Sequence, residues 1–170
     1  MIITEAEAYE AMLAHHAILD RDVKSRSQVV VGEVGKGNSY QPAVADLVSY
    51  LNSEVLPHAL AEEDSIYKIA AGIPGMSSMV QQMTLEHRAL ADAITSLKSA
   101  SGGTQAARES AEISALFSSH VAKENDLILP RLLADPEVDL SVALTQMHEL
   151  FEAAKRSVSS LESSETPASD

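Results

Sequence analysis

The sequence predicts an all-α fold, an up-down-up-down four-helix bundle with an additional C-terminal helix. Of the 170 residues, 45% are hydrophobic but only 4% are aromatic, and there is no Trp, so aliphatic side chains must fill the core. Few Gly residues and few β-branched or aromatic runs favour helices packed on helices. Apolar residues recur every three or four positions through long segments separated by short breaks. Long helices with short connections form such a bundle.

The first helix is expected from about residue 4 to about residue 33, and the second from about 41 to about 72. Thr4 is a suitable N-cap for the first helix, because acidic residues follow it in the first turn, where the helix dipole favours them. Pro42 suits the first turn of the second helix.

Pro57 lies inside the second expected helix, directly before His58. An internal proline removes a backbone donor and usually bends a helix. Two interpretations have equal weight. The reshaped turn helps to aim His58, or the bend is ordinary and has no functional meaning.

Two more bundle helices are expected at about 75–100 and 105–134, followed by an extra helix at about 138–161. The bundle therefore covers about residues 4–134, and residues 1–162 form one domain. Residues 163–170 lack apolar partners, and we expect them to be a disordered tail.

Charge and composition exclude several classes of function. A formal net charge of −13 repels phosphate backbones and anionic lipids, so we expect no nucleic-acid partner and no membrane partner. The absence of Cys excludes disulfides, thiolate metal sites and thiol nucleophiles. The N-terminus lacks the features of a signal peptide, and no apolar run reaches the roughly 18 residues that span a bilayer. A cytoplasmic protein is expected.

One motif occurs twice in the chain. Residues 58–66 and 120–128 both read His-x-x-x-Glu-x-Asp-x-Ile. Positions i and i+4 lie one turn apart on the same face of a helix, so each copy directs an imidazole and a carboxylate the same way. A lone helical histidine precedes each copy, His16 before the first and His87 before the second.

This supply of side chains predicts a metal site with two ions. A single helical histidine is usually a packing residue, and a buried His–Glu network without metal is a weaker alternative, but the repetition favours metal. Two glutamates on inward-facing stripes would otherwise be costly to bury. Nitrogen and oxygen donors without sulfur favour iron. The predicted ligands are His16, His58, Glu62, His87, His120 and Glu124.

Other residues remain alternatives around this site. His15 competes with His16, but His16 keeps better phase with the apolar residues of its helix. Tyr50 and Glu54 precede His58 by two turns and one turn, and could join the site, although packing and a solvated face are the simpler roles. His148 could reach the site from the last helix as a proton relay or pocket wall, or could simply pack between helices.

The pattern resembles the hemerythrin-like, cation-binding domain over about residues 8–135. Neighbouring residues agree with it, including Leu56-Pro57-His58 at the start of the first motif and Leu127-Ile128-Leu129-Pro130 at the end of the second. The resemblance implies a four-helix bundle with two iron ions joined by an oxo or hydroxo bridge. It also implies that Glu62 and Glu124 bridge the irons. His16 and His58 would then serve one iron, and His87 and His120 the other.

The chain departs from the oxygen-carrying hemerythrins. They have a His-x-x-x-His pair on the third helix, whereas Met83 precedes His87 here by one turn. Their fourth helix has Asp five residues after its His, in place of Glu124. The departure favours reaction with a small oxidant, hydrogen peroxide or nitric oxide, in catalase-like or peroxidase-like turnover without catalytic groups beyond the metal ligands. The alternatives are reversible dioxygen binding, sensing, iron storage, or a structural metal. Met83, Leu85, Leu116 and Phe117 are expected to form a dry pocket wall.

Overall fold

The computed structural model describes residues 4–164, with side chains described from residue 4 to residue 157. The elements in chain order are α1 (Glu5–Gly35), α2 (Gln41–Tyr50), the π-helical turn η1 (Leu51–Val55), α3 (Leu56–Asp64), α4 (Ile66–Gly72), α5 (Ser77–Lys98), α6 (Gly103–Lys123), the π-helical turn η2 (Glu124–Ile128), α7 (Leu129–Ala134) and α8 (Leu140–Ser164). Every regular element of this described part is helical, which confirms the predicted all-α fold.

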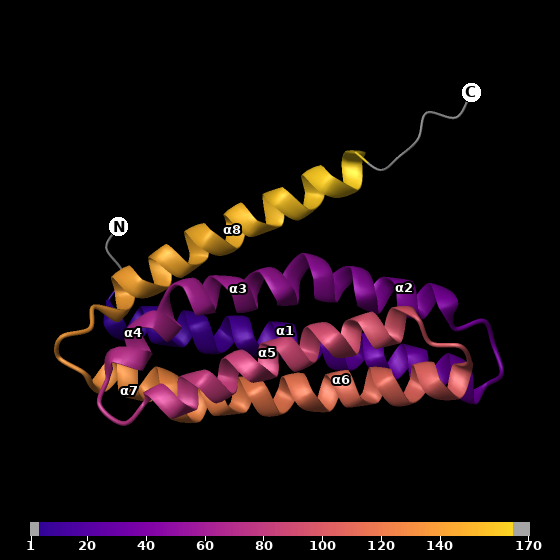
Figure 1. Cartoon of the computed structure of the whole chain (residues 1–170), viewed down its shortest axis with the longest axis horizontal. Helices are drawn as coiled ribbons and strands as arrows, with labels where there is room; N and C mark the ends of the chain where they lie inside the picture. Colours follow the sequence, from indigo (N-terminus) through magenta and orange to yellow (C-terminus); the bar gives the residue numbers. More distant parts are fainter. Residues whose placement is uncertain (1–3, 165–170) are drawn as a thin grey trace.

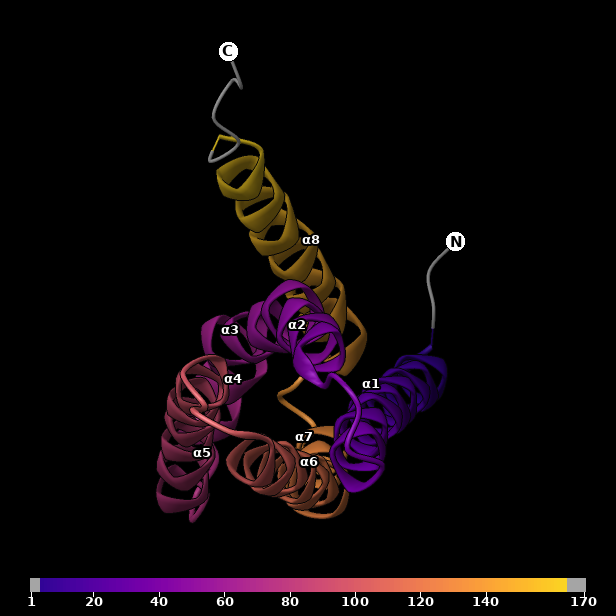
Figure 2. The ribbon, with the colours of Figure 1, turned by 90° about the vertical axis from the view of Figure 1, so that its right-hand side faces the viewer.

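The helices form four rods around one core, with α8 outside them (Figure 1). One rod is α1, the second is the series α2–η1–α3–α4, the third is α5, and the fourth is α6–η2–α7. The end view in Figure 2 shows these rods around a common centre, and α1 packs on α6, α6 on α5, and α2 on both α1 and α5. The first part of α8 packs on α3, α1 and η1, and its end runs away from the bundle (Figure 1).

The ends of the chain refine two expectations. Thr4 is the N-cap of α1, and the capping box is reciprocal: its hydroxyl accepts from the Glu7 N–H at 3.2 Å, while its own N–H donates to the Glu7 carboxylate at 2.8 Å. At the other end α8 continues to Ser164, so the first two residues of the predicted tail belong to this helix, because no helix breaker precedes Pro167. Residues 165–170 of that tail lie outside the described residues. No helix within residues 4–164 is long and apolar enough to cross a membrane.

The two π-helical turns explain how prolines fit inside long helices. In η1 the Leu56 N–H donates a hydrogen bond to the carbonyl of Leu51, five residues earlier, and Pro57 is the next residue. In η2 the Leu129 N–H donates to the Glu124 carbonyl, and Pro130 follows. A proline lacks the N–H and clashes with the carbonyl four residues earlier, so a wider turn just before it relieves the conflict. The turn η1 lies just before the first copy of the motif, and η2 lies inside the second copy.

The core has a polar layer between two apolar clusters. One cluster gathers at the α4, α7 and α8 end and includes Met12, Ala61, Met83 and Ile128. The other fills the opposite end and includes Leu19, Val55, Leu90 and Val121. Along each of the four rods, the predicted metal ligands lie between a residue of the first cluster and a residue of the second. Apolar side chains therefore close the layer on both sides.

Candidate metal centre

All six predicted ligands reach this buried layer. His16 comes from α1, His58 and Glu62 from α3, His87 from α5, His120 from α6, and Glu124 is the first residue of η2. None of them is more than 6% exposed. Ionisable groups are this deeply buried only when they are paired or bind a metal.

The six side chains form two groups that could each hold a metal ion. The donor atoms of His16, His58 and Glu62 lie within 4.8 Å of one another, and the same holds for those of Glu62, His87, His120 and Glu124. Glu62 belongs to both groups. The two groups of donor atoms are therefore neighbours that share one carboxylate.

Glu62 is the centre of the first group. Its carboxylate lies 3.0 Å from Nε2 of His58, 3.3 Å from Nε2 of His16 and 3.5 Å from Nε2 of His87. Burial alone would raise the pKa of Glu62, but the nearby imidazoles outweigh it and hold the pKa well below its usual range. For His16 the effects have the opposite signs: burial alone would lower its pKa, but Glu62 and Glu124 raise that pKa to about 9. The Glu62 carboxylate thus stays ionised, the form that binds a cation.

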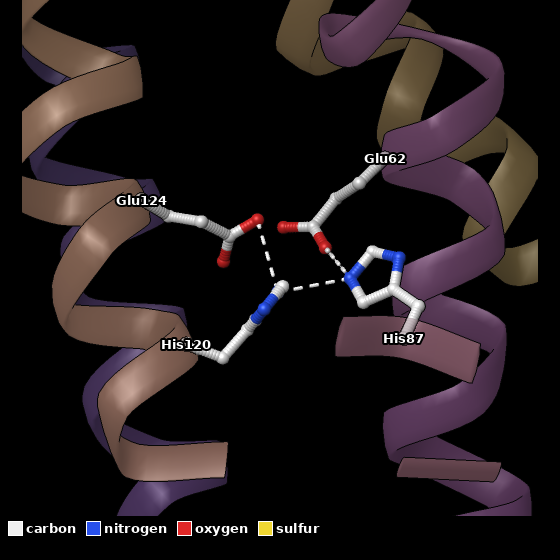
Figure 3. Close-up of side chains that lie close together, drawn as sticks. All are labelled: Glu62, His87, His120 and Glu124. Carbon is white, nitrogen blue, oxygen red and sulfur yellow. Dashed lines mark hydrogen bonds and ion pairs between the residues drawn. The ribbon is translucent and has the colours of Figure 1, made fainter. Parts of the chain in front are cut away.

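Glu124 has a different set of neighbours. Figure 3 shows its carboxylate approaching that of Glu62 from the opposite rod, with the rings of His87 and His120 beside them. The His120 Nε2 lies 3.5 Å from Glu124 and 2.9 Å from Nε2 of His87. The Tyr67 hydroxyl donates to Glu124, and the Tyr67 ring stacks on His87 with centroids 5.4 Å apart. Burial, with the carboxylates of Glu62 and Glu124, raises the pKa of Tyr67, so its phenol keeps its proton.

The unpaired atoms of the layer fit a cation. Within the described residues, Oε2 of Glu124 and both ring nitrogens of His58 are buried without a hydrogen-bond partner, and the 3.0 Å approach of His58 to Glu62 lacks hydrogen-bond geometry. Buried polar atoms normally have a partner, so each such atom requires an explanation. A metal ion that accepts lone pairs from imidazole nitrogen and carboxylate oxygen supplies one.

Three of the four histidines are also held from outside the layer. Histidines that bind metals through one nitrogen usually donate the other N–H to a fixed acceptor, which sets the ring orientation. The pairs through Nδ1 are His16 with Asn125 at 2.6 Å, His87 with Glu63 at 2.8 Å, and His120 with Glu86 at 3.2 Å. These contacts aim Nε2 of all three rings into the layer.

Sequence reasoning missed these outer partners and Tyr67. A signal for two of them existed, since Glu63 and Asn125 each directly follow the glutamate of a motif. Tyr67 had no such signal: it is five positions after Glu62, about 140° away on a continuous helix. The helix breaks at Ser65, between α3 and α4, and this break turns Tyr67 into the layer.

None of the residues raised as alternatives belongs to either group of donor atoms. His15 is half-buried beside His58, with ring centroids 4.8 Å apart, and does not belong to either group. Tyr50 donates to Asp22 at 3.3 Å, and Glu54 pairs with Lys155 at 2.8 Å.

His148 is exposed on α8 and lines a cavity whose wall also includes His58, in agreement with the pocket-wall alternative. Leu85 was expected in the pocket wall, and that expectation is wrong, because it is 59% exposed. It lies about 200° around α5 from the buried Met83, which faces the core.

Comparison with known families agrees with this geometry. The model of the family described as hemerythrin HHE cation binding domain matches residues 7–132. The match begins two residues after the start of α1 and ends two residues before the end of α7. It includes both groups of donor atoms but not α8. Searches of curated proteins and of solved structures found no match.

Proposed function

The chain belongs to the hemerythrin family, and from that premise we propose that its buried layer binds two iron ions which react with hydrogen peroxide in catalase-like or peroxidase-like turnover. The cation-binding family and a buried His/Glu group able to bind metal support the first half of the proposal. The second half depends on what surrounds the donors.

The donor set supports two ions. Each group offers three or four donor atoms, fewer than the six of an octahedral iron ion, so positions remain for small exogenous ligands. Glu62 is shared, and Oε2 of Glu124 lies 3.7 Å from Nε2 of His16, so both carboxylates stand between the two groups. Iron held there would supply the one-electron redox steps that the side chains themselves cannot supply.

Tyr67 is the observation that favours peroxide. Cleavage of the O–O bond needs protons delivered to oxygen, and the protonated Tyr67 hydroxyl lies inside the layer, bonded to Glu124 and 3.4 Å from Nε2 of His120. The catalase-like reaction balances without another reactant, since two H2O2 give two H2O and one O2. The peroxidase-like reaction requires a donor of two electrons and two protons for each H2O2.

The buried Met83 agrees with this proposal. It occupies the position one turn before His87, is fully buried, and belongs to the apolar cluster that closes one side of the layer. Its thioether is a poor ligand for oxidised iron, so the third rod contributes one nitrogen instead of two. A centre with fewer nitrogen ligands has more positions at which an oxidant can bind.

Replacing Tyr67 by Phe tests the proposal. The protein is purified with iron present, its metal is counted, and oxygen release from hydrogen peroxide is followed. We expect about two irons per chain in both proteins and a fall in turnover of about 100-fold or more in Tyr67→Phe, the scale of positioned proton transfer.

Tyr50→Phe is the matched control, because Tyr50 bonds to Asp22 outside the layer, and it should turn over peroxide normally. A wild-type protein that keeps two irons but forms only a dioxygen adduct, lost under vacuum, would replace this proposal with reversible oxygen binding. Turnover of nitric oxide alone would change the oxidant, and a single colourless metal would indicate a structural site.

A further inference from the structure

His58 is the one cluster histidine whose Nδ1 has no partner among the described residues. The ring is 2% exposed, its Nε2 faces Glu62, and its Nδ1 is buried and unpaired. The other three rings each donate Nδ1–H to a side-chain oxygen of this chain. When Nε2 binds a cation, Nδ1 carries the proton and must donate it to some acceptor. The acceptor for His58 has to come from outside the described chain.

His58 is also part of the wall of a cavity. The cavity has a volume of about 360 Å³ and lies between α1, α3 and α8. Phe151 and His15 flank the His58 ring, with centroids 6.0 and 4.8 Å away. Other wall residues are Met12, Met147 and His148. The wall thus includes the ring of a predicted metal ligand, and Nδ1 of that ring is buried and unpaired.

The wall is apolar and carries no formal charge. None of the described residues lining it is Asp, Glu, Lys or Arg, in a chain whose net charge is −13. Its polar side chains are three imidazoles and the hydroxyl of Thr145. The nearest cation described at Phe151 is Lys155, which is paired with Glu54 at 2.8 Å. A carboxylate ligand would lose its hydration here without gaining a cation, so a neutral ligand is favoured.

We propose that this cavity binds a small phenol, with the phenol oxygen accepting a hydrogen bond from Nδ1–H of His58. The volume is near the lower end of ordinary ligand pockets, which suits a single aromatic ring. Phe151 provides an edge or face for that ring, and Met147 a thioether, both favourable neighbours of an aromatic group. His15 also lines the cavity and provides a second imidazole for the hydroxyl.

The proposal rests on the proposed function for its chemical use. A phenol with a second hydroxyl, a hydroquinone, is oxidised to a quinone and releases two electrons and two protons. One H2O2 consumes both and gives two H2O, so the peroxidase-like reaction balances. His58 connects the two sites, because its ring lines the cavity and its Nε2 faces Glu62.

The binding part of the proposal does not depend on turnover. Five of the wall residues come from α8, which lies beyond residue 132, where the family match ends: Leu144, Thr145, Met147, His148 and Phe151. The cavity is therefore a feature that this chain builds with its own extra helix.

Calorimetric titration of the full-length, metal-loaded protein with hydroquinone tests binding. We expect saturable binding of one molecule per chain, with a Kd of about 1 mM or below for a ligand of this size. Thr145→Phe, which fills the cavity from α8, should weaken binding at least tenfold. Gln146→Phe is the matched control, because Gln146 is exposed and does not line the cavity. This variant should leave binding unchanged.

A second measurement follows peroxide consumption with and without hydroquinone. Stimulation by hydroquinone that is lost in Thr145→Phe and kept in Gln146→Phe would establish its use as reductant. Binding without stimulation would support the binding site and contradict its proposed use in peroxide reduction. No saturable binding up to about 10 mM, or equal binding by both Phe variants, would overturn the site itself, whatever the metal does.

Discussion

The two copies of the motif share one sequence pattern but have different surroundings. In the first copy, Glu62 is approached by three histidines, and Nδ1 of His58 is unpaired beside a cavity. In the second copy, Glu124 accepts from Tyr67, and Nδ1 of His120 is held by Glu86. The motif supplies donors to the layer in both copies, and the helices packed behind each copy decide what else that copy can do.

The π-helical turns η1 and η2 also differ in where they lie relative to the two copies. In the first copy η1 ends three residues before His58, so both motif residues lie on the regular helix α3. In the second copy η2 begins at Glu124 itself, so the motif is split between α6 and a π-helical turn. A π-helical turn advances the chain around the axis differently from an α-helical turn. The geometry of the second copy therefore depends more on the turn than that of the first.

The largest expected effect comes from the carboxylate that both groups share. Glu62→Ala should reduce bound iron from about two ions per chain to near zero, because each group loses a donor and affinity falls by more than the 10–100-fold typical of outer partners. Glu124→Ala removes a donor from one group only and should retain more metal. Elemental analysis of purified protein measures both.

Glu54→Ala serves as control, since this carboxylate lies two turns before Glu62 and pairs with Lys155 instead. It should keep the full metal content. If Glu62→Ala keeps as much iron as Glu54→Ala, then the shared carboxylate is not a ligand and the assignment of the layer fails.

A smaller effect is expected from the outer partner that only the second copy has. Glu86→Gln weakens the hold on Nδ1 of His120, and metal affinity should fall by about 10–100-fold, measured by competition with a chelator. Glu112→Gln is the matched control, because Glu112 is 60% exposed and pairs with Arg108 on the surface. An unchanged affinity in Glu86→Gln would mean that the second copy is no better supported than the first.

The sequence predicted what repeats and missed what depends on packing. Helical periodicity and breaks predicted the rods, and the repeated i,i+4 spacing predicted four residues of the layer. The other two, His16 and His87, could be named because each is a helical histidine that precedes one copy of the motif. Tyr67 could not be found, because its position depends on the break at Ser65, which no Gly or Pro announces. The cavity could not be found either, since it exists only where α8 crosses α1 and α3, and the angle of that crossing is not encoded in spacing.

The smallest effects come from two similar lysines. Lys155 ties α8 to Glu54 at 2.8 Å near the first copy, and Lys123 pairs with Glu86 at 2.5 Å behind the second, both about one-third exposed. Replacing either by Met should change the free energy of unfolding by about 0.5 kcal/mol or less, as for other partly exposed pairs, measured by urea denaturation. Their effects on metal should differ. Lys123→Met frees the carboxylate that orients His120 and should lower metal affinity a few-fold, whereas Lys155→Met should leave it unchanged. Both variants remove one positive charge. An equal change in metal affinity would therefore show that the effect comes from net charge, and that the surroundings of the two copies do not differ in their effect on metal binding.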